Sequence, residues 1–439
     1  MPTILEELKD WLRIPSVSTN GGDATALKRS AEWVCERIEA AGGTAEPVTI
    51  DGGHPMAIGE LRSNRPDAPT VLAYGHHDVQ DVGEPGAWDS PPFEPEERDG
   101  RLYARGAADD KGNFLPALHV ACELARAGEL PVNVRFLVEG EEETSSASAM
   151  RWIHEDERGA DAALVYDLMM ADEATPAVTV ATRGLIAADV EVRTGARDVH
   201  SGVYGGAVPN AAHVLLRMLA EVAPDATGRA RPELSPGLEP PSEEERESWK
   251  SLQPGAEVIA EAGTRPVVPD AAGEFYERTG ASTSVDVNMI SVGEPRTIVP
   301  AVASGHVTVR RAAGQSAAAV GAALERLLRA AAPEEAEVSV EMSLADPAVF
   351  DPASPAVRLS LDAMERACGT RPALIRSGGT IPILAELSAR GIDTVATGFA
   401  TGGDAFHAPN ESYRIESLRL GEASTREIYL ALGALSLSR

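Results

Sequence analysis

The stretch TVLAYGHHDV, residues 70–79, joins a buried-strand pattern to a pair of candidate ligands. Residues 70–74 form a short apolar run, which is typical of a buried strand. The chain then turns at Gly75 and presents His76 and Asp78. Side chains two residues apart in an extended segment lie on one face, so Asp78 can accept a hydrogen bond from the His76 ring and fix its tautomer. We therefore expect His76 to face a metal, although a lone His-x-Asp pair has little weight by itself.

Four further segments carry an acid or a histidine in a comparable position. The adjacent acids Asp109 and Asp110 stand before an expected helix, where one can cap the helix and the other can bridge metals. Acids at 139 and 141–143 close an expected strand. Without cations they would repel one another in an apolar setting, although a solvated acidic loop has the same composition. In open α/β sheets ligands bind where strands end. The candidate ligands and acids of these segments are Asp109, Glu142, Glu143, Asp167 and His407.

The first part of the chain alternates between expected helices and strands. Asp23 is a candidate N-cap of the second helix, and Gly42-Gly43 is its stop signal. This alternation predicts an α/β domain in which helices cover a sheet. We expect helices over residues 4–12, 24–41 and 114–127, and strands over residues 70–74, 132–138 and 162–166.

The pattern changes near residue 182 and returns to alternating helices and strands near residue 346. Between these points the order of strand, helix, strand, strand, helix, strand predicts a small α+β domain inserted into the first domain. The domains would comprise residues 1–182 with 347–439, and residues 183–346. A stretch rich in Pro and Glu, residues 224–247, is expected to be irregular. The inserted domain would use strands over 186–192, 284–290, 302–310 and 335–344 and helices over 210–222 and 316–331.

Composition excludes several classes of function. The 439 residues carry a net charge of −29, which disfavours nucleic acid and anionic membranes as partners. The three cysteines are far apart and lack a CxxC pair, which is typical of thiols in a reducing compartment. The N-terminal residues have acids where a signal peptide would have an apolar core, and no apolar run reaches about 18 residues. We therefore expect a cytoplasmic protein.

Five motifs together resemble the M20 family of co-catalytic metallopeptidases, which includes aminoacylases, carboxypeptidases, desuccinylases and dipeptidases. They are GHHDVQ, LYARGAADDKGN, EGEEE, RDVHSGVYGG and GGTIP, and they most resemble the dipeptidase branch of carnosinases and cytosolic nonspecific dipeptidase. The resemblance covers nearly the full length. It implies a helix-flanked mixed-sheet catalytic domain, residues 1–182 and 347–439. It also implies an inserted, ferredoxin-like lid and dimerisation domain, residues 183–346.

The resemblance implies a site for two divalent metals, with zinc preferred and manganese or cobalt as alternatives. His76 and Asp167 would hold one ion, Glu143 and His407 the other, and Asp109 would bridge both. The mixture of imidazole and carboxylate ligands suits zinc.

The resemblance also implies the roles of two further acids. Asp78 would orient His76, and Glu142 would be the general base that activates a metal-bridging water. Choosing Glu142 and Glu143 over Glu141 and Glu142 depends on aligning the Glu-Gly-x-Glu-Glu pattern.

The resemblance extends to the inserted domain. His200 would reach the active site of the partner subunit in a homodimer and stabilise the oxyanion. Arg310 would pair with the carboxylate of the substrate, for which a bidentate guanidinium is suited, and Arg311 is the alternative. Positions that match contacts to the substrate backbone are Thr297, Gly379 and Thr380.

The leading hypothesis is a dipeptidase that cleaves dipeptides or very short peptides with a free C-terminal carboxylate. The alternative is an N-acyl amino acid deacylase or desuccinylase with the same two-metal site. Departures from the family pattern at Ser377, Thr380 and residues 311–313 affect substrate selection. A single-metal zincin and a serine hydrolase are disfavoured, since neither His-Glu-x-x-His nor Gly-x-Ser-x-Gly occurs. Histidines expected to be structural, without acidic partners at ligand spacing, are His54, His119, His154, His213 and His306.

Overall fold

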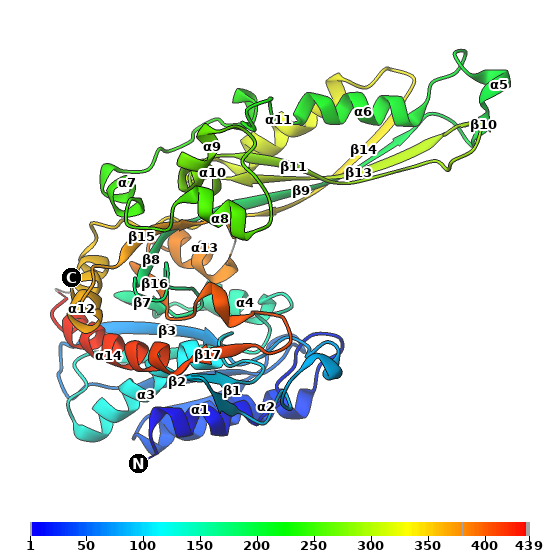
Figure 1. The fold of residues 1–439 in the computed structure, drawn as a ribbon. Coiled ribbons are helices and arrows are strands. Elements are labelled where there is room, and N and C mark those ends of the chain that lie inside the picture. Colours follow the sequence, from blue (N-terminus) through cyan, green and yellow to red (C-terminus); the bar gives the residue numbers. More distant parts are fainter. Residues whose placement is uncertain (1, 380, 436–439) are drawn as a thin grey trace. The chain divides into compact units, whose positions relative to one another are not determined.

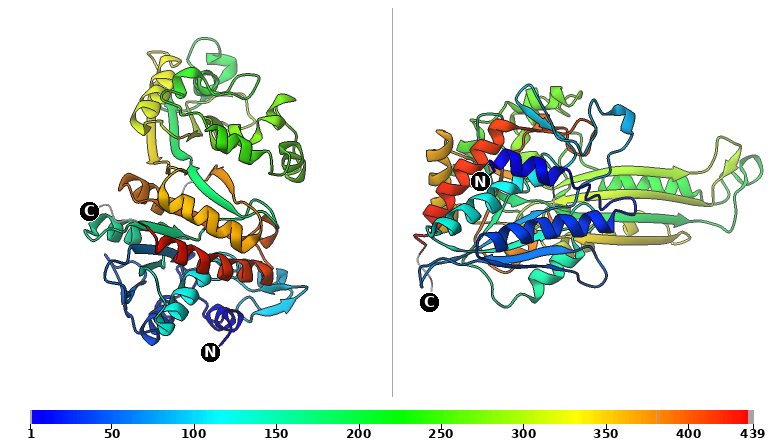
Figure 2. Two further views of the ribbon diagram at one scale, coloured as in Figure 1. Left: turned by 90° about the vertical axis from the view of Figure 1, so that its left-hand side faces the viewer. Right: turned by 90° about the horizontal axis from the view of Figure 1, so that it is seen from below.

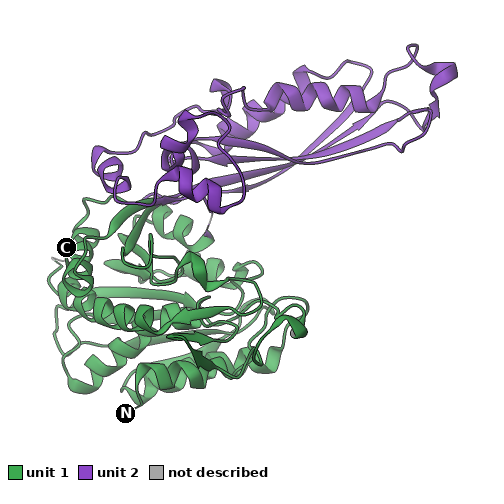
Figure 3. Ribbon diagram, in the orientation of Figure 1, with its two compact units in different colours: residues 1–180, 350–375, 382–439 green, residues 181–349, 376–381 purple. Residues whose placement is uncertain are grey.

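The structure, a computed structural model, describes residues 2–379 and 381–435. The chain forms two compact units (Figure 3). Unit 1 comprises Met1–Val180, Phe350–Ile375 and Pro382–Arg439, and unit 2 comprises Ala181–Val349 and Arg376–Ile381.

The short segment 376–381, assigned to the first domain by the sequence, belongs to unit 2. Its first residue, Arg376, forms a buried ion pair with Glu245 at 2.6 Å. The carbonyl of Ser377 accepts a hydrogen bond from the backbone of Arg183. Both partners are unit 2 residues, so local contacts hold the segment there.

Unit 1 is built on a mixed eight-stranded sheet with the order β1-β2-β6-β3-β7-β16-β8-β15 (Figure 1). The neighbours β6, β3, β7 and β16 run parallel, whereas β1 and β2 extend one side with antiparallel pairings. The strands are β1 (Thr44–Val48), β2 (Met56–Leu61), β3 (Thr70–His76), β6 (Asn133–Glu139), β7 (Ala162–Val165), β8 (Ala177–Thr182), β15 (Ala373–Ser377) and β16 (Thr394–Gly398).

The three strands predicted from apolar runs are confirmed as β3, β6 and β7. All residues of β7 are buried, as are all residues of β3 and β6 after the first. Central strands of a parallel sheet are covered on both faces, which explains the continuous rather than alternating apolar pattern.

Helices flank the sheet in two groups. Helices α1, α2, α3 and α14 lie side by side, with α12 packed on α14, and α4 packs with α13 (Figure 2). The predicted helices at 4–12, 24–41 and 114–127 are confirmed, and the third begins three residues early. The helices are α1 (Ile4–Leu12), α2 (Ala24–Ala40), α3 (Lys111–Ala127), α4 (Ala147–Glu155), α12 (Pro355–Cys368), α13 (Pro382–Ala389) and α14 (Ile415–Leu432).

Local signals and packing agree in this helical layer. Asp23 caps α2 as predicted, because its carboxylate accepts hydrogen bonds from the backbone of Thr25 and Ala26. The rings of Trp11 on α1 and Trp33 on α2 stack with centroids 4.7 Å apart. Such an aromatic pair adds roughly 0.5–1.5 kcal/mol beyond area burial.

A small antiparallel sheet with the order β17-β5-β4 joins distant parts of the chain. Its strands are β4 (Glu96–Arg98), β5 (Arg101–Tyr103) and β17 (Ser412–Arg414). The pairing of Ser412 with Tyr103 brings the loop before β17 against the loop after β5. These two loops carry candidate ligands from opposite ends of the sequence.

Unit 2 contains a four-stranded antiparallel sheet with the order β11-β13-β9-β14. Helices α6 and α11 pack on it and on each other, which confirms the predicted ferredoxin-like arrangement. Strand β9 alternates between buried and more exposed residues, as a sheet with one covered face requires. The elements are β9 (Gly184–Arg193), α6 (Ala211–Val222), β11 (Ser284–Val292), β13 (Val302–Arg311), α11 (Ala317–Ala330) and β14 (Glu337–Ala345).

Smaller elements occupy the loops of unit 2, and they correct the prediction that residues 224–247 are irregular. Helix α7 begins at Glu243, because Ser242 and Glu245 form a reciprocal capping box. The Ser-x-x-Glu signal was present in the sequence. The remaining elements are β10 (Val199–His200), α5 (Ser201–Tyr204), η2 (Pro232–Leu234), α7 (Glu243–Trp249), α8 (Gly255–Glu261), α9 (Asp270–Gly273), α10 (Phe275–Gly280) and β12 (Ile298–Val299) in unit 2, with η1 (Pro85–Ala87) and η3 (Gly402–Asp404) in unit 1.

None of the helices in the described residues is long and apolar enough to cross a membrane.

Candidate active site

The candidate ligands gather where three parallel strands of unit 1 end. His76 is the last residue of β3 and pairs in register with Glu139, the last residue of β6. Glu142 and Glu143 follow β6, and Asp167 follows β7 two residues after its end. Since the carboxyl ends of parallel strands meet at one edge, residues distant in sequence converge there.

Two groups of metal-type ligands overlap at Asp109. The first contains His76, Asp109 and Asp167, and the second contains Asp109, Glu143 and His407. In each group the ligand atoms lie within 4.8 Å of one another. A single shared carboxylate between two ligand sets has the composition of a dinuclear centre.

The two oxygens of Asp109 serve different histidines. Oδ1 lies 3.0 Å from His76 Nε2, and Oδ2 lies 3.0 Å from His407 Nε2. His76 Nε2 also lies 3.8 Å from Asp167 Oδ1, and His407 Nε2 lies 3.2 Å from Glu143 Oε2. Each histidine therefore faces two carboxylates through the same ring nitrogen.

Asp78 orients several residues at this edge of the sheet. Its buried carboxylate lies 3.4 Å from His76 Nδ1, and its backbone carbonyl lies 3.0 Å from the same nitrogen. The carboxylate also accepts hydrogen bonds from the backbone of Glu142 and Glu143 and from the Ser18 hydroxyl. One side chain thus orients a histidine and the loop that carries both glutamates.

Glu411 is a second organising carboxylate, which the sequence analysis did not select. It is fully buried and accepts hydrogen bonds from Arg105 Nη1 and the backbone of Gly106, Ala108 and Asp109, at 2.8–3.1 Å. It therefore fixes the backbone of the central ligand. An acid four residues after His407 was visible in the sequence, but its partners lie about 300 residues away and only the fold reveals them.

Asp110 differs from its expected role. It occupies the N-cap position of α3 but makes no capping hydrogen bond with its side chain. Its Oδ2 instead accepts a hydrogen bond from the backbone of His76 at 3.1 Å. The peptide between Asp109 and Asp110 is cis. Another contact absent from the sequence analysis joins Gln80 Nε2 to Glu143 Oε2 at 2.9 Å.

Burial and crowding shift the titration of the acids. Burial, reinforced by neighbouring carboxylates such as Asp109, raises the pKa of Glu142 to about 7. Burial also raises the pKa of Asp167 well above its usual range. Burial acts in the same direction on Asp109, but hydrogen bonds from His407 and His76 outweigh it and lower the pKa of that carboxyl.

The two histidines are held in their protonated form by these acids. Hydrogen bonds with Asp109 and Glu143 raise the pKa of His407 to about 10. Burial opposes protonation of His76, yet contacts with Asp109 and Asp78 raise its pKa well above the usual range. A cation bound at either ring nitrogen would replace its proton.

The donor set fits two divalent cations. Two imidazoles and three carboxylates converge, and the buried ammonium of Lys111 does not compensate them, because it donates to the carbonyls of Trp11 and Ile14. Closely packed buried carboxylates are costly unless they are paired or bind metal. Imidazole with carboxylate is a zinc-type set, also used by manganese and cobalt.

Comparison with known proteins agrees with this geometry. A sequence model of Peptidase family M20/M25/M40 matches residues 72–430. The chain belongs to this family. It is therefore a peptidase, a hydrolase that acts on peptide bonds, and the predicted family resemblance is confirmed.

Curated relatives of this M20 peptidase are named as dipeptidases. The cysteinylglycine-S-conjugate dipeptidase of Corynebacterium striatum is 28% identical, and the match covers 96% of this chain and 94% of the relative. The human Beta-Ala-His dipeptidase is also 28% identical, over 81% of this chain and 73% of the relative.

Solved structures of the family share its fold. An M20 family metallo-carboxypeptidase from Sulfolobus solfataricus has a TM-score of 0.84 and 26% identity, with 99% of this chain and 100% of that chain covered. Human carnosine dipeptidase 1 has a TM-score of 0.76 and 25% identity, with 98% and 96% covered. The predicted helix-flanked mixed sheet with an inserted α+β domain is confirmed.

The remaining predicted site residues of the M20 peptidase lie in unit 2. His200 is exposed at the N-cap of α5, where its Nδ1 accepts a hydrogen bond from Gly202. Thr297 precedes β12, and its carbonyl accepts a hydrogen bond from Ser201. The backbone N–H of Gly379 donates a hydrogen bond to the Ser377 hydroxyl, and Thr380 lies outside the described residues.

The structure distinguishes the two candidate arginines. Arg311 is fully buried and donates to the carbonyls of Gln315 and Ala345 and to Asp346. These contacts use the Arg311 guanidinium within the fold, so it is not available to bind a substrate. Arg310 is half-buried on β13 and remains the candidate.

Three of the histidines expected to be structural have acidic partners in the fold. His119 lies 2.8 Å from Glu7, His306 lies 2.7 Å from Asp189, and His154 lies 3.4 Å from Glu386. These acids come from other secondary-structure elements, so spacing along the chain could not reveal them.

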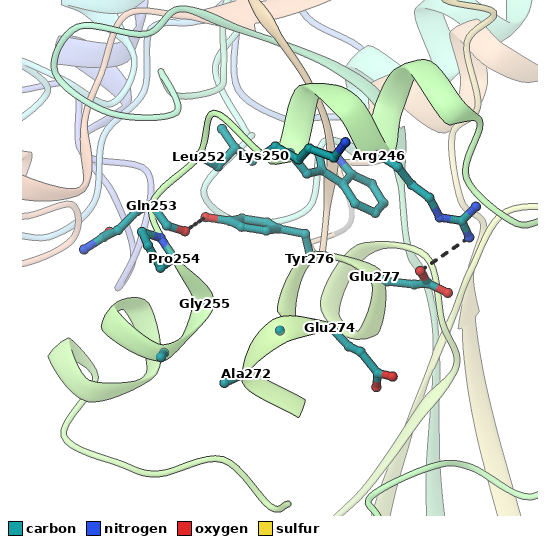
Figure 4. Close-up of a pocket in the computed structure, with 13 residues that line it drawn as sticks. Arg246, Lys250, Leu252, Gln253, Pro254, Gly255, Ala272, Glu274, Tyr276 and Glu277 are labelled. Atoms are coloured by element: carbon teal, nitrogen blue, oxygen red, sulfur yellow. Dashed lines mark hydrogen bonds and ion pairs between the residues drawn. The ribbon is translucent and has the colours of Figure 1, made fainter. Parts of the chain in front are cut away.

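A cavity of about 580 Å³ lies within unit 2 and contains none of the predicted site residues (Figure 4). It is formed by the segment 246–277, with Tyr276 donating its hydroxyl proton to the carbonyl of Gln253. Nothing in its lining supplies the ligand set found at Asp109.

We predict that Glu411→Gln weakens metal binding, because the amide can accept fewer of the four hydrogen bonds that hold the loop before Asp109. Metal affinity should fall roughly 10–100-fold while the chain stays folded. Equilibrium dialysis with metal analysis and circular dichroism measure the two quantities. The exposed variant Glu416→Gln is the control, and unchanged affinity in Glu411→Gln would contradict this role.

We predict that metal affinity rises with pH up to about 10, the pKa of His407 in the metal-free site. Below that pH the His407 ring holds a proton, which a cation must displace in order to bind. For each proton displaced, the metal affinity falls about tenfold for every unit by which the pH is lowered. Manganese titration by calorimetry in buffers of different ionisation enthalpy counts the released protons. His407→Asn should release fewer, and pH-independent binding without proton release would refute the assignment.

Proposed function

We propose that the chain is a dinuclear metal-dependent dipeptidase. The observation that carries the proposal is the Asp109 carboxylate, whose two oxygens each lie 3.0 Å from a different histidine. His76 and Asp167 would hold one divalent ion, Glu143 and His407 the other, and Asp109 would bridge them. Zinc is the preferred ion for this set of ligands. Residues 1–182 and 347–439 would form the catalytic domain.

The ions would polarise the scissile carbonyl and lower the pKa of the attacking water. Glu142 would take the proton from that water and return it to the leaving amine. A general base is most effective when its pKa is near the working pH, and burial raises that of Glu142 to about 7. Asp78 would fix the positions of His76 and of the Glu142 backbone through its contacts with both.

The substrate would be a dipeptide or very short peptide with a free C-terminal carboxylate. Relatives named as dipeptidases and as a metallo-carboxypeptidase support this class. Arg310 would pair with the substrate carboxylate, since a planar guanidinium binds carboxylates in a bidentate manner. Thr297, Gly379 and Thr380 would contact its backbone. The alternative substrates are N-acyl amino acids.

Residues 183–346, which form most of unit 2, would act as the lid and dimerisation domain. Its edge strand β11 pairs only with β13 among the described strands, and it exposes 36–49% of Val287, Met289, Ile290 and Val292. An exposed apolar sheet edge is a site for association, and a second copy of this chain offers the same edge. In that homodimer His200 would reach the active site of the partner subunit and stabilise the oxyanion.

The activity is tested with a substrate panel. The zinc-loaded protein should hydrolyse cysteinylglycine or β-alanyl-histidine faster than N-acetyl or N-succinyl amino acids, and a chelator should abolish turnover. Glu142→Gln should keep its metal content and lose about 10²–10⁴-fold in kcat, because proton transfer from water fails. Initial rates and metal analysis measure these effects.

The neighbouring variant Glu141→Gln is the matched control, because Glu141 binds the backbone of His54 and Ser148 and is not a predicted ligand. Faster turnover of N-acyl substrates would replace the dipeptidase proposal with the deacylase alternative. Equal loss of metal and activity in Glu142→Gln would make that residue a ligand.

We predict that two inactive variants complement each other in hybrid dimers. Co-expressed His200→Ala and Glu142→Gln chains would form one intact site per hybrid, which restores about a quarter of wild-type activity in a random mixture of symmetric dimers. Co-expression of His200→Ala with the double variant is the control and should stay inactive. Absence of complementation in proven hybrid dimers would exclude a shared site.

A further inference from the structure

A second set of metal-type ligands lies on the helices of unit 1 and shares no residue with the set around Asp109. His119 and Glu123 of α3 and Glu422 of α14 place one ligand atom each within 4.8 Å of the others. Helices α1, α3 and α14 lie side by side (Figure 2). One imidazole with two carboxylates is a sufficient protein ligand set for zinc with water in the fourth position.

The orientation of His119 is that of a metal ligand. The residue is 6% exposed, and its Nδ1 lies 2.8 Å from Oε2 of Glu7 on α1. A carboxylate at Nδ1 fixes the ring proton there and leaves the Nε2 lone pair free for a cation. That nitrogen lies 3.6 Å from Glu123 Oε1, which is beyond hydrogen-bond distance, and makes no hydrogen bond within the described residues.

The two carboxylates are placed by the helices. Glu123 follows His119 by four residues, so both side chains lie on one face of α3. Its Oε2 accepts a hydrogen bond from Arg426 of α14, which leaves Oε1 directed toward His119. The Glu123 side chain is 28% exposed and Glu422 is half-buried, so water can reach the position opposite the imidazole.

We propose that His119, Glu123 and Glu422 bind a third divalent cation, with zinc preferred, and that Glu7 orients the histidine. The ion would sit between α3 and α14 and, through Glu7, reach α1. Its binding would stabilise the packing of these helices. The proposed ion takes no part in the hydrolytic reaction, so the test of this site is independent of the test of the proposed dipeptidase activity.

The proposal is tested by zinc stoichiometry in the full chain. Wild-type protein should bind one more zinc ion than His119→Gln, and the third ion should raise the melting temperature of the wild type only. His154→Gln is the matched control, because His154 also pairs with a glutamate but lies exposed outside the cluster. Hydrolytic activity should be equal in all three proteins at saturating zinc.

If His119→Gln folds poorly, a second variant and a crystallographic measurement still test the proposal. Glu422→Gln removes one ligand at a half-buried position and should lower the affinity for the third ion at least tenfold. Anomalous diffraction from zinc-soaked crystals should place a peak about 2.1 Å from His119 Nε2. Equal stoichiometry in the wild type and both variants, with no peak there, would show that the cluster is an ion-pair network and overturn the proposal.

Discussion

The Asp109 carboxylate, placed between two imidazoles, is the contact on which the rest of the candidate site depends. Its oxygens each face one histidine, and each histidine faces a further carboxylate, Asp167 or Glu143. Gathering acids in a low-dielectric edge of the sheet costs free energy unless positive charge lies between them. In the metal-free protein the protons on His76 and His407 supply that charge, and two divalent cations would supply it more fully.

Two buried carboxylates that are not candidate ligands hold this arrangement in place. The Asp78 carboxylate accepts hydrogen bonds from the backbone of Glu142 and Glu143 and faces His76. The Glu411 carboxylate accepts hydrogen bonds from the backbone of Ala108 and Asp109. Ligand positions are therefore set by hydrogen bonds to backbone groups, which are more rigid than long side chains. Preorganised ligands of this kind bind metal without first paying for the ordering of a loop.

Much of this could be predicted from the sequence because the signals are local. The apolar run before Gly75 predicted β3, and Asp23 predicted the start of α2. The alternating pattern of the middle segment predicted the four-stranded sheet of unit 2. The candidate ligands were found because each follows an expected strand or lies in a Gly-rich loop, and because the motifs are arranged in the order typical of one family.

Predictions that needed partners from elsewhere in the fold were wrong or absent. Asp110 does not cap α3, since the backbone of His76 offers a competing donor from a neighbouring strand. Arg311 is held by the loops around it, so Arg310 remains the candidate for substrate recognition. His119 lies near acids on three helices, and two of these acids, Glu7 and Glu422, are more than 100 residues away in the sequence.

By itself, the sequence determined the central helices and strands, the inserted domain and the identity of the candidate ligands, because these depend on periodicity and on short motifs. Only the tertiary structure decided which of these residues meet. Glu411 contacts the loop before Asp109 because β17 pairs with β5, a pairing that joins residues about 310 positions apart. Spacing along a chain carries no record of such contacts, since their free energy is gained only when distant segments pack together.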